Sequence, residues 1–272
     1  MDRLERRLLS RLARASQDYG LIEPGDRIMV AVSGGKDSYV MLHLLQEVQR
    51  RVAFDVELIA VHLDQHQPGF DSGVVEAFLA ARDVPYRIVR EDTYSVVVEE
   101  TRPGKAYCSL CSRLRRGILY TTAVDLGCTK IALGHHRDDS IETLMLNLFY
   151  SGQLKAMPPR LTSDDGRNVV IRPLIGCAEA DIAALATQLG FPVQPCTVCS
   201  RQPDLKRARV KALLDELHAE NDKVRGNVFA ALSNVKPSHL LDPQLRELAG
   251  VEALTGAEEA LLEVEGVGAG CA

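Results

Sequence analysis

The sequence predicts an α/β fold in which helices cover both faces of a twisted parallel sheet, with a small helical part toward the C-terminus. Short apolar runs of strand length alternate along the chain with segments of helical periodicity, and this alternation is typical of parallel sheets. A glycine-rich turn follows the first apolar run, and in such sheets ligands bind beyond the carboxyl ends of the strands. The 272 residues suffice for one large domain with a smaller appendage.

Apolar runs of four to eight residues mark the expected strands. The first run is followed by Gly34 and Gly35 and then by a helical pattern, which indicates a strand, a tight turn and a helix. Residues 155–166 contain Met-Pro-Pro and Asp-Asp-Gly, and this turn chemistry predicts a loop. The expected strands are residues 28–32, 56–63, 86–89, 130–133 and 169–174.

Helical periodicity marks the segments that separate and follow these strands. The first helix places Leu4, Leu8, Leu12 and Ala15 on one face, as expected for a helix that packs on a core. The remaining expected helices cover residues 39–45, 112–126, 140–149, 179–189, 205–218 and 224–232.

The composition excludes several classes of protein. No apolar run approaches the roughly 18 residues that a membrane-spanning helix needs, and arginines interrupt the first 14 residues, unlike the core of a secretion signal. Seven cysteines without an export signal argue against a disulfide framework and for thiolate chemistry or metal binding. We therefore expect a cytoplasmic protein that does not bind a membrane.

The turn after the first strand has the chemistry of a phosphate site. Two glycines allow a tight turn, and the N–H groups at the start of the following helix then point toward one anion. The turn differs from the common P-loop, because Val30 stands where that motif has its first glycine. A bare Gly-Gly turn is the plainer alternative. The expected phosphate-binding residues are Ser33, Gly34, Gly35, Lys36, Asp37 and Ser38.

Two Cys-x-x-Cys pairs form the second group of chemically active residues. Cys108 and Cys111 make one pair, and Cys196 and Cys199 make the other. A spacing of three lets two thiolates reach one metal, and neighbouring arginines favour the thiolate form. On spacing alone, zinc and an iron–sulfur cluster both remain open. The other cysteines are expected to be buried apolar residues, namely Cys128, Cys177 and Cys271.

Residues 33–38 match the SGGxDS signature of the PP-loop pyrophosphatases, which split ATP to adenylate a carbonyl oxygen. Further stretches, between about residue 18 and residue 241, agree in order with one branch of those enzymes. The chain thereby resembles the tRNA 2-thiocytidine synthetase (TtcA) family. These stretches are residues 108–117, 134–139, 155–159, 171–174, 195–199 and 237–240.

The resemblance implies an adenine nucleotide alpha hydrolase-like fold and a specific reaction. ATP adenylates O2 of a cytidine at position 32 of the tRNA anticodon loop, and a sulfide from an iron–sulfur cluster then attacks C2. Mg²⁺ shares the charge of the pyrophosphate with Lys36. By position, the ligands of a [4Fe–4S] cluster would be Cys108, Cys111 and Cys199, with Cys196 the weaker assignment. Three ligands leave one iron open, whereas four thiolates on zinc would be structural.

Several candidate residues follow other expected strands. Asp64 ends the strand at 56–63, and Gly134 and His135 follow the strand at 130–133, so all three are expected beside the nucleotide. One of Asp138 and Asp139 is expected to cap the next helix, while the other approaches Mg²⁺ or the substrate. The catalytic candidates are Lys36, Asp37, Asp138 and Asp139.

The resemblance also suggests how the chain is divided. Residues 241–272 carry seven acidic side chains and one basic one, so the rest of the chain has a net charge of +1. Basic clusters near residues 113–116, 155–167 and 206–211 are solvated helix faces or contacts to RNA phosphates. The expected parts are an N-terminal helix (1–20), the PP-loop core with its cysteine site (21–200), a helical RNA-contacting part (201–240) and an acidic tail (241–272).

The implied partners are the tRNA anticodon loop, a cysteine desulfurase as sulfur source, and a second copy of the chain in a homodimer. A tRNA 2-thiouridine synthetase is the nearest alternative, although those enzymes carry further Cys-x-x-Cys pairs at the chain ends. A lysidine-type tRNA ligase would share residues 33–38 but would not need the cysteines. A nucleotide-dependent RNA-binding protein with structural zinc and no turnover is the alternative from another class.

Overall fold

The structure is a computed structural model that describes residues 2–101, 108–194 and 205–251. The chain divides into two compact units, Met1–Phe229 and Ala230–Ala272. The first unit contains the sheet, the turn at residues 33–38 and the helices packed around them. None of the described helices is both long enough and apolar enough to cross a membrane.

Six strands of the described residues form one sheet in the order β3-β2-β1-β4-β6-β5. The pairs from β3 to β6 are parallel, and β5 pairs with β6 antiparallel at the edge. Five of the strands correspond to the five expected apolar runs, which confirms the predicted fold class. Their bounds are β1 Asp26–Ala31, β2 Val56–Asp64, β3 Tyr86–Arg90, β4 Lys130–Ala132, β5 Arg160–Thr162 and β6 Val169–Ile171.

The prediction that residues 155–166 form a loop is wrong in part, because this segment contains the short strand β5. Three exposed residues of this segment pair with β6 in the register Arg160↔Ile171 to Thr162↔Val169. The Asp-Asp-Gly turn itself is present, and Gly166 N–H donates to the Ser163 carbonyl over 2.8 Å. The turn therefore closes a hairpin, and a strand of three exposed residues carries no hydrophobic pattern by which it could be predicted.

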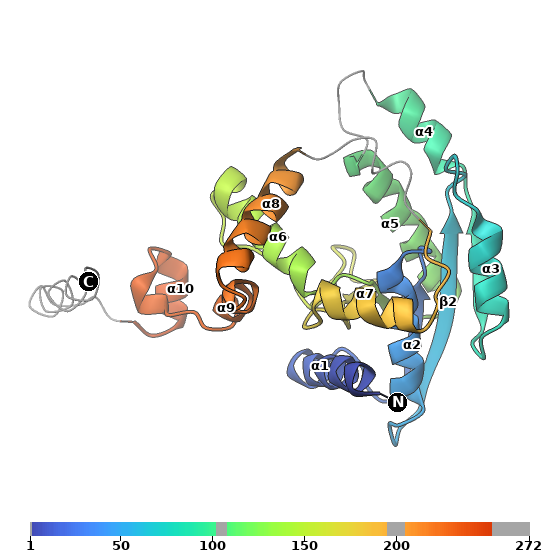
Figure 1. Cartoon of the computed structure of the whole chain (residues 1–272), viewed down its shortest axis with the longest axis horizontal. Helices are drawn as coiled ribbons and strands as arrows, with labels where there is room; N and C mark the ends of the chain where they lie inside the picture. Colours follow the sequence, from blue (N-terminus) through green and yellow to red (C-terminus); the bar gives the residue numbers. More distant parts are fainter. Residues whose placement is uncertain (1, 102–107, 195–204, 252–272) are drawn as a thin grey trace, which may run out of the picture. The chain divides into compact units, whose positions relative to one another are not determined.

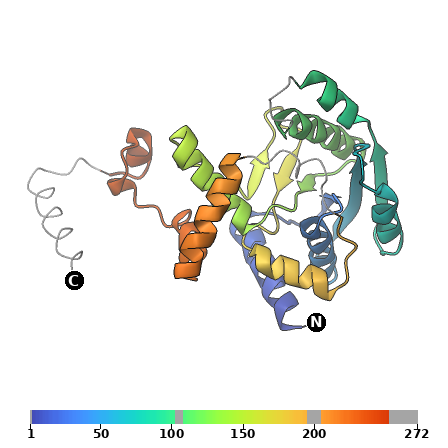
Figure 2. The same cartoon turned by 45° about the horizontal axis from the view of Figure 1, so that its top comes forward.

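Helices cover both faces of the sheet (Figures 1 and 2). Because strand side chains alternate, Ile28 and Val30 of β1 pack with α1, α2, α3 and α7, whereas Met29 packs with α5 on the other face. The expected apolar face of the first helix is confirmed, with Leu8 and Leu12 fully buried. The helices are α1 Arg3–Tyr19, α2 Lys36–Gln49, α3 Ser72–Ala80, α4 Thr93–Glu100, α5 Cys108–Asp125, α6 Arg137–Ser151 and α7 Glu179–Gln188.

Two further helices follow, α8 Leu205–Glu220 and α9 Val224–Ala231, and the first unit ends within α9. They join α6 through a small separate core in which Ile141 of α6 packs with Val210 and Leu214 of α8. The second unit contains a 3-10 helix, η2 Pro237–His239, and α10 Pro243–Leu248, which Asp242 caps. The helix α10 lies within the range that the charge pattern marked as an acidic tail.

The strand order places the expected ligand site. Strands β2 and β4 lie on opposite sides of β1. The chain therefore continues from β1 to β2 on one side and from β4 toward β6 on the other. Such a reversal opens a crevice at the carboxyl end of the central strand. The turn at residues 33–38 follows β1 at this position.

Candidate functional site

The turn between β1 and α2 is shaped as an anion cradle. Gly34 has a φ of 84°, in the left-handed region, and a Cβ there would lie 2.8 Å from Cζ of Phe70. Gly35 precedes α2, and no side chain of the described residues caps this helix end. The first N–H groups of α2 therefore remain available to an anion, together with the positive end of the helix dipole.

The two serines of the turn serve mainly to close it. The buried Ser38 hydroxyl accepts a hydrogen bond from Ser33 N–H over 3.1 Å and donates one to the Gly35 carbonyl over 2.9 Å. The Ser33 hydroxyl lies 3.3 Å from Oγ of Ser38. Of the phosphate-binding side chains expected in the turn, Ser38 is thus engaged within the turn itself.

Lys36 and Asp37 lie at the first turn of α2 beside a carboxylate from α7. The Lys36 ammonium lies 3.2 Å from Asp37 Oδ1 and 3.1 Å from Glu179 Oε1. Burial of Lys36 works against its charge, but these two carboxylates outweigh burial and raise its pKa. The sequence analysis missed Glu179, which is separated from Lys36 by more than 140 residues and carries no motif of its own.

Asp37 holds an oxygen whose hydrogen-bonding capacity is unused. Its Oδ1 is buried and makes no hydrogen bond with the described residues, although Lys36 pairs with it ionically and His136 Nε2 lies 3.7 Å away. Among the described residues, no three His, Cys, Asp or Glu side chains are grouped as a metal site. This set fits a Mg²⁺ ion that takes one carboxylate and the remaining ligands from phosphates and water.

The turn between β4 and α6 packs directly on this helix end. A Cβ on Gly134 would lie 3.2 Å from the backbone carbon of Asp37 and 3.3 Å from Ser38 N, so any larger residue would press the two turns apart by a few tenths of an ångström. This contact brings His135, His136 and Asp139 beside the phosphate turn. The expectation that residues 134–139 lie near residues 33–38 is met by the geometry.

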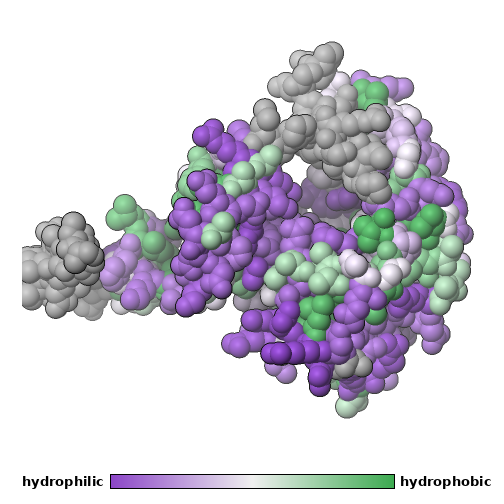
Figure 3. Space-filling view, viewed as in Figure 1, coloured by the Kyte–Doolittle hydropathy of each residue, from purple (hydrophilic) through white to green (hydrophobic). Residues whose placement is uncertain are grey.

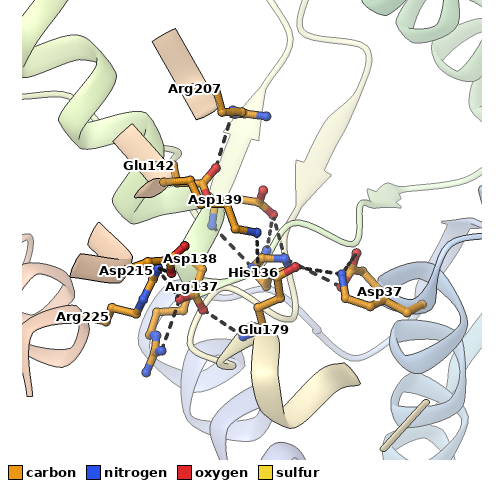
Figure 4. Close-up of polar contacts among 12 residues, drawn as sticks. Asp37, His136, Arg137, Asp138, Asp139, Glu142, Glu179, Arg207, Asp215 and Arg225 are labelled. Atoms are coloured by element: carbon orange, nitrogen blue, oxygen red, sulfur yellow. Dashed lines mark hydrogen bonds and ion pairs between the residues drawn. The ribbon is translucent and has the colours of Figure 1, made fainter. Parts of the chain in front are cut away.

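The structure separates the two aspartates whose roles the sequence left open (Figure 4). Asp139 forms a capping box, accepting from His136 N–H over 3.0 Å while its own N–H donates to His136 Nδ1 over 3.4 Å. Asp138 is buried and faces the opposite way, where it contacts Arg225, Arg137 and the N–H of Glu179. The N-cap of α6 is therefore His136, with Asp139 completing its capping box from the third helical position, so the expectation that one of the two aspartates is the cap is corrected. Asp138 is directed away from the phosphate turn.

His135 is held in its neutral form. Burial, together with the nearby Arg172, lowers the pKa of His135 to about 4. Its Nδ1 is buried and makes no hydrogen bond with the described residues. A neutral imidazole with one unused ring nitrogen is suited to hydrogen-bond a neutral group, such as a base or a ribose hydroxyl.

The depressed pKa of His135 predicts a loss of stability in acid. As the pH falls from 6.5 to about 4, the unfolded chain gains a proton at this residue before the folded chain does. The free energy of unfolding should fall by at most about 3 kcal/mol over this window. In His135→Gln this contribution should be absent. Urea unfolding at several pH values gives the slope of the unfolding free energy against pH for the unaltered protein and for His135→Gln. Equal slopes in the two proteins would contradict the lowered pKa of His135.

The described cysteine of the first pair lies at the same edge of the sheet. Cys111 belongs to the first turn of α5, and its Sγ lies 3.6 Å from Nε2 of Gln65. Gln65 follows Asp64, the last residue of β2, whose carboxylate accepts from His66 N–H over 2.9 Å. Cys111 and Asp64 are thus both placed at the carboxyl end of β2, next to the strand that carries the phosphate turn.

The remaining cysteines differ in position. Cys108 begins α5, but its side chain lies outside the described residues, as do Cys196, Cys199 and Cys271. Cys177 is buried, as expected, and burial raises the pKa of its thiol to about 12. Cys128 is only partly buried and precedes β4, at the amino ends of the strands.

The fold and the phosphate turn define a nucleotide-binding protein of the PP-loop class, and the PP-loop domain family model matches residues 4–210. The chain is 59% identical over 248 residues to a tRNA-cytidine(32) 2-sulfurtransferase of Anaeromyxobacter dehalogenans (strain 2CP-C), covering 91% of this chain and 86% of the relative. It is 51% identical over 266 residues to the protein of that name from Sorangium cellulosum (strain So ce56), covering 98% and 94%. The chain belongs to the tRNA-cytidine(32) 2-sulfurtransferase family of PP-loop proteins.

A solved structure has the same fold. The U34-tRNA thiolase NcsA from Methanococcus maripaludis, with its [4Fe-4S] cluster, superposes with a TM-score of 0.69 at 20% sequence identity. The match covers 86% of this chain and 80% of the thiolase. The family and the fold that the resemblance implied are both confirmed.

Proposed function

We propose that this protein is an ATP-dependent tRNA sulfurtransferase that forms 2-thiocytidine at position 32 of the anticodon loop. The observation that carries the proposal is 59% identity, over 91% of the chain, to a relative that bears this activity in its name. The chemistry explains the need for ATP, because a base carbonyl oxygen is a poor leaving group. Transfer of AMP to O2 releases pyrophosphate, and attack of sulfide on C2 then expels AMP together with that oxygen.

Activation of the carbonyl would take place at the phosphate turn. The free N–H groups of α2 and the ammonium of Lys36 would bind the pyrophosphate part of ATP and stabilise its charge as it leaves. The unused Oδ1 of Asp37 would hold a Mg²⁺ ion that the phosphates share. Asp64 and His135, at the carboxyl ends of the strands on either side of β1, would face the nucleoside part or the substrate base.

Sulfur delivery would use Cys108, Cys111 and Cys199 as ligands of a [4Fe–4S] cluster. Soft thiolates suit iron, and the first turn of a helix such as α5 favours the thiolate form. Such a cluster would supply an iron with an open coordination position for the sulfur that is transferred. The pairing of Cys111 with Gln65 keeps this thiol at the carboxyl edge of the sheet.

Gln194, the last described residue before the second cysteine pair, is anchored at the same edge. Gln194 N–H donates to the Gly34 carbonyl over 3.1 Å, and the Gln194 side chain bonds both backbone groups of Asp71. Cys199 follows Gln194 by five residues, which limits its distance from that anchor to about 17 Å. The nucleotide turn and the proposed ligands can therefore meet, although they lie far apart in the sequence.

The partners are proposed from charge and from the family. Exposed basic residues on α5 and α8, such as Arg113, Arg116 and Arg209, would contact tRNA phosphates. Figure 3 shows a largely hydrophilic surface over α8. A cysteine desulfurase would provide the sulfur, two copies would form a homodimer, and the enzyme would act in the cytoplasm.

Deleting the gene is expected to remove 2-thiocytidine from cellular tRNA, and a plasmid copy should restore it. Mass spectrometry of tRNA nucleosides provides the measurement. Unchanged 2-thiocytidine would contradict the proposal, and loss of 2-thiouridine instead would favour the alternative substrate. Anaerobic purification should give a brown protein with iron and acid-labile sulfide, whereas stoichiometric zinc would favour a binding protein without turnover.

A further inference from the structure

Both carboxylate oxygens of Asp138 are engaged by groups of the protein (Figure 4). Its Oδ1 accepts from Arg225 over 3.0 Å and lies 3.4 Å from Arg137, and its Oδ2 accepts from Glu179 N–H over 2.8 Å. Burial alone would favour the protonated acid, but the N–H of Glu179 and the two guanidinium groups lower the pKa of Asp138. Asp138 is thus a buried, ionised acceptor whose two oxygens both have partners within the protein.

Through this carboxylate, α6 fixes the start of α7. The residue before α7 is Ala178, which has no side chain that could cap the helix. Asp138 takes over this role from a different helix by accepting the first N–H group of α7. The position of Glu179, the first residue of α7, therefore depends on Asp138.

Glu179 in turn holds the lysine of the phosphate turn. Its Oε1 lies 3.1 Å from Lys36 Nζ, and its Oε2 lies 3.3 Å from Lys211 Nζ of α8. Burial would raise the pKa of Glu179, but the hydrogen bond and charge of Lys36 lower it, so Glu179 remains a carboxylate. Lys36 is thereby fixed at the end of α2 before a phosphate arrives.

The last member of this series lies far from the turn along the chain. Arg225 of α9 has a side chain that is 10% exposed, and it bridges Asp138 and the exposed Asp215 of α8, at 3.0 Å and 2.7 Å. Because Arg225 is buried among these partners, it is not available as a phosphate contact. Removing its charge would leave Asp138 buried and less well compensated.

We propose that Arg225 is a positioning residue for Lys36, acting through Asp138 and Glu179. Arg225 holds Asp138, Asp138 caps α7, and Glu179 at the start of α7 presets the Lys36 ammonium for the phosphates of ATP. The inference rests on the proposed function, since it assumes that Lys36 binds ATP. It also assigns Asp138 to this support rather than to Mg²⁺ or substrate.

A double-mutant cycle on ATP binding tests the inference. The dissociation constant of Mg-ATP is measured by calorimetry on the full chain. Arg225→Gln should weaken binding about tenfold, and in a Glu179→Gln background the same change should weaken it less than about twofold. Arg225→Lys keeps the charge and should weaken Mg-ATP binding about threefold in the otherwise unaltered protein, but not in the Glu179→Gln background. Asp215→Asn removes only the exposed partner and should leave binding unchanged.

Each outcome separates the inference from its alternatives. Equal losses in both backgrounds, with a lowered melting temperature, would show that Arg225 supports only the fold and would overturn the inference. If Arg225→Gln does not fold, the cycle is completed with Arg225→Lys, measured with and without Glu179→Gln. Equal losses of Mg-ATP binding in the two backgrounds would again overturn the inference. Failure of the unaltered protein to bind Mg-ATP would overturn the proposed function and this inference together.

Discussion

Replacement of Lys36 by methionine is expected to lower kcat/KM for ATP by about 10²–10³-fold. Methionine keeps most of the side-chain length but removes the charge that would meet the leaving pyrophosphate. It also removes the ammonium partner of Asp37 and Glu179, which pair with Lys36 at 3.2 Å and 3.1 Å, and so leaves less positive charge beside the phosphates. Pyrophosphate release in the presence of tRNA measures the effect.

Lys211→Met is the matched control for this change. Lys211 pairs with the other oxygen of Glu179, over 3.3 Å, but it lies on the exposed face of α8. We expect Lys211→Met to leave the KM for ATP nearly unchanged. A loss of kcat/KM in Lys211→Met equal to that in Lys36→Met would indicate that the phosphate turn does not depend specifically on Lys36.

Replacement of Cys111 by serine is expected to abolish sulfur transfer while the protein still binds ATP. A hydroxyl is a poor ligand for iron, and the cluster would be left with two of its three proposed ligands. The change is nearly isosteric, so the contact of residue 111 with Gln65 should persist. Iron content, ATP affinity and 2-thiocytidine formation are measured on the same preparation. Full activity in the serine variant would rule out Cys111 as a ligand.

Two controls accompany the cysteine change. Cys128→Ser should keep iron and activity, because Cys128 lies at the amino ends of the strands, at the opposite edge of the sheet from Cys111. For the first cysteine of each pair, we expect thiolation to be lost in Cys108→Ala but not in Cys196→Ala. Equal loss in these two variants would contradict the set of three ligands and favour four thiolates on one metal.

The sequence predicted the centre of the sheet well, because its inner parallel strands are buried on both faces and must be apolar. Ile28 and Met29, which point to opposite faces of β1 and are both fully buried, illustrate this rule. The antiparallel strand β5 was missed because its three residues are exposed. The short helices α3 and α4 were also missed, since stretches of eight or nine residues show little periodicity.

The candidate site divides in the same way. The glycines of the phosphate turn could be predicted, because their backbone requirement is local: Gly34 adopts a φ of 84°, and no side chain substitutes for glycine there without strain. Glu179 and Arg225 could not be predicted, because each acts through ion pairs with residues far away in the sequence. A lone acidic or basic residue in a helix is usually a solvated one.

The order of local patterns along the chain sufficed to establish the class of fold, the phosphate turn and the pairs of thiols, because these depend on neighbouring residues. Folding alone settled that Asp139 bonds back to His136, the N-cap of α6, while Asp138 turns toward Arg225, although the two aspartates are adjacent and chemically identical. Successive residues on a helix project about 100° apart, so packing against α7 and α9 assigns each carboxylate its own partners.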